Sequence, residues 1–244
     1  MGTASPLSAQ LLVDPLEVTI TTTGGNRVGA SFSLSNTSDK VVQATITRQD
    51  WDRVENGDNR FLPSGTSGSS CGSILTASPV SIRVEPHTSR IVRLGVQNAA
   101  ALNKECWDIF FVEEVPQRAP VKGNSLQYIF RTGVKVYVAP SGLARDGAVE
   151  DMAIEQNKKP QLAIRFHNTG ATHLVSKGRL EFRRLDNTLA RQIPIEEFPT
   201  LPGAVRKVLV DLPADLPAGD YVVLALIDFG GAELVAGQID YQAK

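Results

Sequence analysis

Short runs of alternating apolar and polar residues recur along most of the chain. In residues 27–36, for example, Val28, Ala30, Phe32 and Leu34 alternate with small or polar residues. This alternation is typical of a strand with one buried face. Similar strand-like runs occupy residues 41–47, 80–84, 90–96, 107–115, 125–138, 161–166, 178–184, 206–212, 221–229 and 234–241. Because these runs are separated by Gly, Pro, Asn and Asp clusters, the pattern predicts an all-β protein of antiparallel sandwiches.

The segment Ala139-Pro140-Ser141-Gly142 interrupts this pattern near the middle of the chain. Proline cannot continue a central strand, and glycine frees the backbone. Each half has about 100–140 residues, which is enough for a hydrophobic core of its own. We therefore expect two β-sandwich domains, residues 1–139 and residues 140–244.

The run 125–138 is longer than an ordinary strand of about 5–6 residues. Its even positions are Leu126, Tyr128, Phe130, Thr132, Val134, Val136 and Val138. Two interpretations fit this apolar face. Either the whole stripe belongs to the core, or the valines fill the domain while Leu126, Tyr128 and Phe130 extend beyond it and contact another chain.

Composition narrows the possible partners. The 25 basic and 26 acidic residues give a net charge of -1, which does not favour a nucleic-acid partner. No apolar stretch reaches the roughly 18–20 residues that span a bilayer, so we expect no membrane insertion. Residues 1–10 lack the features of a signal peptide, so we expect a cytosolic chain or one that is already mature.

The sequence offers little support for catalysis. The three histidines have no Cys, His, Asp or Glu neighbours at metal-ligand spacing, and no nucleophile elbow or phosphate-binding glycine loop is present. We expect no enzymatic activity, no metal and no cofactor. Cys71 and Cys106 can form one disulfide or remain two reduced thiols, and their spacing does not decide between these states.

Several segments of the first half, in order, resemble one known family. They are Val13–Val18, Leu34–Ser38, Pro79–Val96, Glu105–Pro116 with its aromatic strand and closing proline, and Gly133–Pro140 with its lysine and closing proline. Over roughly residues 10–140 the chain is similar to the periplasmic pilus-assembly chaperones, the PapD-like proteins of the chaperone–usher pathways. The second half has the expected size and β character but matches only loosely.

This resemblance implies two immunoglobulin-like β-sandwiches in a boomerang arrangement and a mechanism of donor-strand complementation. In that mechanism the chaperone's last strand fills the groove of a subunit that lacks one of its own strands. The side chains that would enter the groove are Leu126, Tyr128 and Phe130. The family also uses a basic pair to hold the subunit's terminal carboxylate. Its lysine corresponds to Lys135, whereas Glu17 stands where its arginine is expected.

The resemblance also implies a location and partners. We expect a mature periplasmic chaperone that binds pilin-like or coat-fibre subunits and delivers them to an outer-membrane usher. Because the periplasm is oxidising, we predict the Cys71–Cys106 disulfide. The alternative is a non-catalytic structural or adhesive module with an immunoglobulin-like fold and no client.

Overall fold

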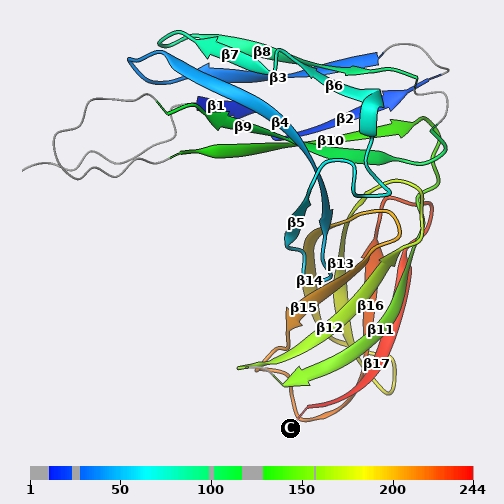
Figure 1. Cartoon of the computed structure of the whole chain (residues 1–244). Helices are drawn as coiled ribbons and strands as arrows, with labels where there is room; N and C mark the ends of the chain where they lie inside the picture. Colours follow the sequence, from blue (N-terminus) through cyan, green and yellow to red (C-terminus); the bar gives the residue numbers. More distant parts are fainter. Residues whose placement is uncertain (1–10, 24–27, 99–101, 117–128, 157, 244) are drawn as a thin grey trace, which may run out of the picture. The chain divides into compact units, whose positions relative to one another are not determined.

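The computed structural model describes residues 11–23, 28–98, 102–116, 129–156 and 158–243 (Figure 1). The first half carries strands β1 (Leu11–Asp14), β2 (Glu17–Thr22), β3 (Val28–Asn36), β4 (Val42–Arg53), β5 (Asn59–Leu62), β6 (Leu75–Ser78), β7 (Ser81–Val84), β8 (Ser89–Val96), β9 (Cys106–Glu114) and β10 (Arg131–Pro140), with the 3-10 turn η1 (Gly72–Ile74). The second half carries β11 (Gly147–Gln156), β12 (Pro160–Asn168), β13 (Leu174–Arg184), β14 (Leu189–Thr200), β15 (Val205–Asp211), β16 (Gly219–Asp228) and β17 (Val235–Ala243). The predicted all-β fold class is confirmed.

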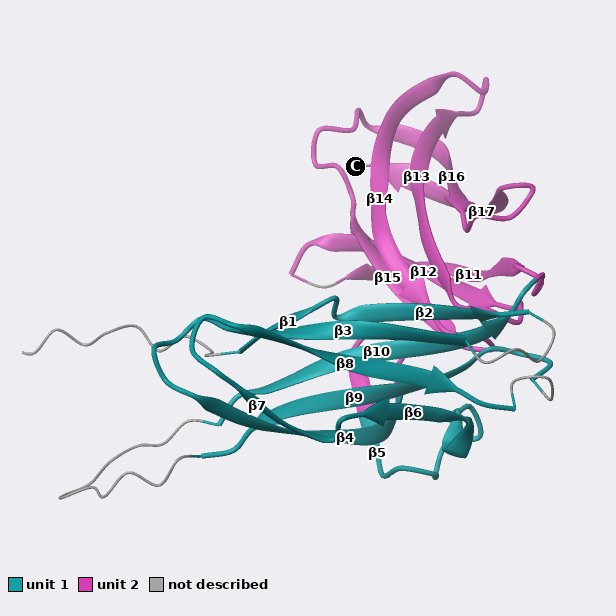
Figure 2. Ribbon diagram, turned by 90° about the horizontal axis from the view of Figure 1, so that it is seen from above, with its two compact units in different colours: residues 1–51, 61–141 teal, residues 52–60, 142–244 magenta. Residues whose placement is uncertain are grey.

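The chain forms two compact units (Figure 2). The first unit contains residues 1–51 and 61–141, and the second contains residues 52–60 and 142–244. The domain division at residues 139 and 140, like the boomerang arrangement, stays a prediction. The structure adds one feature that the sequence did not predict, which is the assignment of residues 52–60 to the second unit.

The first unit is a sandwich of two sheets. One sheet has the strand order β1-β3-β8-β6, and the other has the order β2-β10-β9-β4-β5, with β7 also paired to β4. The alternation predicted for residues 27–36 places Phe32 and Leu34 in the core between these sheets. Val134, Val136 and Val138 of β10 lie in the same core and are fully buried.

The second unit is a sandwich of the sheets β11-β12-β15 and β14-β13-β16-β17. Its core includes Phe166 and Phe182, whose side chains are fully buried. Tyr221 is buried at the start of β16 and donates its hydroxyl to the carbonyl of Pro217 at 2.8 Å. A tyrosine that bonds back to the chain just upstream is a feature of immunoglobulin-like sandwiches.

A buried asparagine closes the end of a strand in each unit. Asn36 ends β3 and donates to the carbonyl of Lys40 at 2.7 Å, while its own oxygen accepts the Ser38 amide at 2.9 Å. Asn168 ends β12 and makes the corresponding bonds to Thr172 at 2.9 Å and from Gly170 at 3.0 Å. Because each side chain replaces main-chain partners that the turn does not supply, both asparagines act as structural residues.

Residues 52–60 form the tip of the β4–β5 hairpin and bond to β12 and β15 within the second unit. The carboxylate of Glu55 accepts two hydrogen bonds from Arg165, at 2.7 and 3.1 Å. Its carbonyl accepts the Lys207 amide at 2.8 Å. The strand β4 therefore begins in one unit and ends in the other.

Most predicted strands are present with shifted ends, but six strands of the described chain are not among the predicted runs. They are β1, β2, β5, β6, β11 and β14. The segment Val13–Val18, identified by resemblance, overlaps only the adjoining ends of β1 and β2. The predicted run 41–47 extends to Arg53 in β4. Residues 129 and 130 of the long run 125–138 precede the strand, which starts at Arg131. Among the described residues, no helix has the length and hydropathy needed to cross a membrane.

Candidate functional site

Within the described residues, one main-chain edge of β10 has no strand partner over part of its length. β10 pairs with β9 from Arg131 to Val138, but its parallel pairing with β2 begins only at Lys135. Over Arg131–Val134 the edge that faces β2 is therefore not paired with a strand of the described chain. Unpaired N–H and C=O groups on such an edge can pair with another chain.

The face of β10 that carries Val134, Val136 and Val138 is the core face of the first unit. Phe130 is in phase with these valines in the sequence alternation, and it is half-buried. Its carbonyl accepts the Glu114 amide at 3.2 Å. Leu126 and Tyr128 lie outside the described residues. The valines thus fill the domain, and the role of the preceding stripe stays a prediction.

Lys135 points to the opposite face of β10, over an aromatic side chain. Its Nζ lies 4.8 Å from the centroid of the Trp51 ring, a cation–π distance. Trp51 is fully buried at the far end of β4 and packs edge-on against Tyr137 at 6.1 Å. Its carbonyl accepts the indole N–H of Trp107 at 2.8 Å. The aromatic ring that contacts the lysine side chain is therefore held in place by buried contacts.

Glu17 is the β2 residue directly opposite Lys135. The two Cα atoms are register partners in the parallel β2–β10 pair. Along β2, Glu17, Thr19 and Thr21 are exposed while the residues between them are buried, so Glu17 lies on the outer face. Partners in register project to the same face of a sheet, and neighbouring strands are about 4.8 Å apart. The structure therefore places an acidic side chain next to the lysine.

A second cation on the same face was not predicted from the sequence. The guanidinium of Arg131 lies 3.6 Å from the Phe111 ring centroid and 3.7 Å from a carboxylate oxygen of Glu113. Phe111 also packs edge-on against Phe61 at 5.1 Å. The alternation of β10, which puts residues 131 and 135 on one face, is the sequence signal that would have revealed this arginine.

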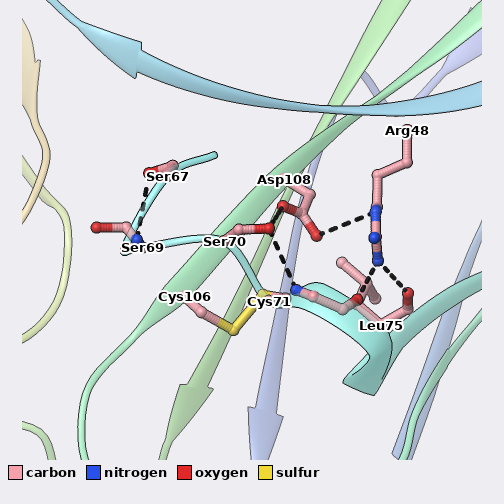
Figure 3. Close-up of a disulfide and its surroundings, with 9 residues drawn as sticks. Arg48, Ser67, Ser69, Ser70, Cys71, Leu75, Cys106 and Asp108 are labelled. Carbon is pink, nitrogen blue, oxygen red and sulfur yellow. Dashed lines mark hydrogen bonds and ion pairs between the residues drawn. A yellow bond between two sulfur atoms is a disulfide. The ribbon is translucent and has the colours of Figure 1, made fainter. Parts of the chain in front are cut away.

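The predicted disulfide joins Cys71 to Cys106 and fastens a loop to the start of β9 (Figure 3). In that loop the Ser70 hydroxyl donates to Asp108 at 2.8 Å. The main-chain amides of Thr66 and Ser67 donate to Asp50 at 2.8 and 2.7 Å. Two aspartates and a disulfide thus hold the loop against the sheet.

Asp50 and Asp108 are fully buried and close to each other. Gln49 is opposite Ile109 in the β4–β9 pair, so the next antiparallel position sets Asp50 opposite Asp108. The guanidinium of Arg48 lies 3.8 Å from Asp108 and also donates to the carbonyls of Gly72 and Leu75. One oxygen of each aspartate is buried without a hydrogen-bond partner. The cluster therefore contains more negative charge than its donors satisfy.

Burial acts on both carboxyl groups in the same direction, but their pKa values shift in opposite directions. Burial raises the pKa of Asp108 to about 6, and the neighbouring Asp50 charge adds to the rise against the Ser70 hydrogen bond and the Arg48 charge. Burial also acts to raise the pKa of Asp50, but the amides of Ser67, Gly65 and Thr66 and the Ser70 hydroxyl hold it below its ordinary value. Among the described residues no group of three or more His, Cys, Asp or Glu side chains is suited to hold a metal ion.

These features define a class of protein: a chain of two β-sandwiches, the first with an open strand edge beside a lysine. The chain matches the family model described as pili and flagellar-assembly chaperone, PapD N-terminal domain, over residues 13–144. This match covers more than half of the 244 residues. The chain belongs to the PapD-like chaperones of the chaperone–usher pathway, a periplasmic and non-catalytic family.

Solved structures support the two-sandwich fold. The class 5 fimbriae chaperone CfaA is 14% identical with a TM-score of 0.58, and the match covers 93% of this chain and 98% of that one. A chain from a chaperone–tip adhesin complex of CFA/I fimbriae is 13% identical with a TM-score of 0.58, and the match covers 96% and 100%. The YadV chaperone is 18% identical with a TM-score of 0.52, with the same coverage. No curated protein matches the sequence.

Proposed function

We propose that this chain binds pilin-like or coat-fibre subunits by donor-strand complementation and delivers them to an outer-membrane usher. The observation that carries the proposal is the edge of β10 at Arg131–Val134, which has no β2 partner among the described residues. An incoming strand gains a main-chain ladder at such an edge, and alternate side chains supply specificity. One similar structure is that of a chaperone–tip adhesin complex, which supports the same class of partner for this chain.

Two groups of side chains have distinct roles in this proposal. Leu126, Tyr128 and Phe130 enter the groove of the subunit, where each large apolar side chain contributes roughly 1.5–3 kcal/mol on burial. Lys135 binds the subunit's terminal carboxylate from the opposite face of β10. Its contact with the Trp51 ring supports this role, because a lysine that is already positioned loses less rotamer entropy on binding.

The proposal is tested by co-expression with the secreted subunits of the same organism. The tested variant replaces Leu126, Tyr128 and Phe130 together by Ser, and we expect it to lose subunit capture while its thermal unfolding changes little. The matched control replaces three exposed apolar residues of the same unit by Ser. These are Leu12, Val80 and Ile91, which are 61%, 62% and 55% exposed.

A second comparison separates binding from folding. Replacing Val134, Val136 and Val138 by Ser removes fully buried side chains, so we expect a severe loss of stability. If the variant at residues 126, 128 and 130 unfolds as badly, those residues belong to the core and the donor-strand mechanism is refuted. If the wild-type chain captures no subunit at all, the alternative of a structural or adhesive module without a client is favoured.

A further inference from the structure

We propose that Glu17 is a specificity-determining residue of the subunit-binding site. Together with Lys135 it selects chain ends in which the terminal carboxylate is accompanied by a hydrogen-bond donor or a cation on the last side chain. This inference rests on the proposed function, because it concerns the group that Lys135 binds.

The first argument is the register of the parallel β2–β10 pair. Glu17 and Lys135 are opposite each other, and the Lys135 amide donates to the carbonyl of Leu16 at 2.9 Å. The two side chains therefore leave the sheet side by side, on strands about 4.8 Å apart. The Nζ of Lys135 lies toward Trp51 of β4, on the side of β10 away from β2. A chain end whose carboxylate binds Nζ therefore meets Glu17 by reaching back toward β2 with its last side chain.

The second argument is that the lysine side chain has a defined position. The Trp51 ring lies under Nζ at 4.8 Å, and Trp51 is itself fixed by Tyr137 and by the indole of Trp107. Glu17 is exposed, so its carboxylate remains accessible to a bound ligand. The site thus combines one positioned ammonium group with one exposed carboxylate.

The third argument is the balance of charge on these neighbouring positions. Lys135 and Glu17 carry opposite charges, and the other outward residues of β2 are the uncharged Thr19 and Thr21. The second cation on this face of β10, Arg131, is paired with Glu113. A bare carboxylate is attracted by the lysine and repelled by the glutamate. A terminal residue such as Lys, Arg or Ser satisfies both groups, whereas a terminal Glu or Asp adds a second repulsion.

The test titrates isotope-labelled protein with acetylated peptides of sequence Gly-Ser-Thr-Val-Thr-X at low ionic strength. X is Lys, Ser, Ala or Glu with a free carboxylate, and a fifth peptide ends in an amidated Lys. Binding is followed from the amide signals of residues 17 and 135. We expect the Lys-ended peptide to bind most tightly and the Glu-ended peptide most weakly.

The decisive variant is Glu17→Gln, which keeps the shape of the side chain and removes its charge. We expect it to reduce the preference for the Lys-ended over the Glu-ended peptide on the order of tenfold, the size of one unit-charge interaction near a protein surface. The matched control is Glu85→Gln, an exposed glutamate that pairs with Arg83 outside β2 and β10. We expect this control to leave the preference unchanged.

The outcomes separate this inference from the proposed function. If free-carboxylate peptides bind better than the amidated one but Glu17→Gln leaves the preference unchanged, Glu17 does not determine specificity and only this inference is overturned. If amidation has no effect, or if no peptide perturbs the signal of residue 135, the carboxylate anchor at Lys135 fails and the inference fails with it.

Discussion

Replacing Asp108 by Asn should change how the stability of the first unit depends on pH. Asp108 is fully buried on the core face of β9, opposite Asp50, and one of its oxygens has no hydrogen-bond partner. Asparagine has nearly the same shape and keeps an oxygen that can accept the hydroxyl of Ser70, 2.8 Å away in the native chain. The substitution therefore removes a titrating charge with little change in packing.

The magnitude follows from the pKa of the buried carboxyl group. Burial raises the pKa of Asp108 from 3.8 to about 6, so the folded state binds its proton more tightly than the unfolded state does. The wild-type protein consequently loses stability as the pH rises from about 4 to about 6, and the loss is complete above that range. A shift of about two units corresponds to about 3 kcal/mol. The Asn variant lacks this loss.

The assay is denaturant unfolding of wild type and Asp108→Asn at a series of pH values, with the exposed Asp14→Asn as the control for the substitution itself. We expect the Asn variant to gain about 2–3 kcal/mol relative to wild type between about pH 4 and pH 7. If altered packing changes the free energy of unfolding equally at every pH, the difference between the two pH dependences is unaffected. Parallel stability curves for wild type and Asp108→Asn would refute the interpretation of the cluster as an excess of buried negative charge.

Three further predictions concern single features of the first unit. Replacing Cys71 and Cys106 by Ser should lower the free energy of unfolding by about 3–4 kcal/mol, measured against wild type under oxidising conditions, because the disulfide closes a loop with a sequence separation of 35. Lys135→Ala should weaken subunit binding in a pull-down while the unfolding temperature changes little, and unchanged affinity would mean that Lys135 does not bind the client. Asn36→Ala should cost about 2–4 kcal/mol in denaturant unfolding, because it leaves buried main-chain groups without partners. A cost below about 0.5 kcal/mol would show that water replaces those bonds.

The fold class was predictable because period-two alternation reports directly on burial. The run 27–36 became β3 with Phe32 and Leu34 in the core, and the stripe of Val134, Val136 and Val138 became the core face of β10. The disulfide required more than the spacing of the cysteines. It followed from the resemblance to a periplasmic family, because only the compartment decides whether such a pair is oxidised.

Other features depend on contacts that no local pattern records. The tip of the β4–β5 hairpin belongs to the second unit because Glu55 bonds to Arg165 and Lys207, more than a hundred residues away. Likewise, the burial of Asp50 and Asp108 results from the register of two strands and from the loop that covers them. In sequence, an aspartate within an apolar run indicates only that the alternation is interrupted.

The two faces of β10 together explain why a terminal anchor matters for a donor-strand mechanism. A main-chain ladder is almost independent of sequence, so an incoming strand can slide along the open edge, and a slip of one residue turns every side chain to the other face. Lys135 lies on the face opposite Val134 and Phe130, at the point where pairing with β2 begins. In the proposed mechanism, a client whose end is fixed at Lys135 would have its register fixed along Arg131–Val134. Lys135 and Glu17 would then decide both which chain end is accepted and which client side chains meet the apolar stripe.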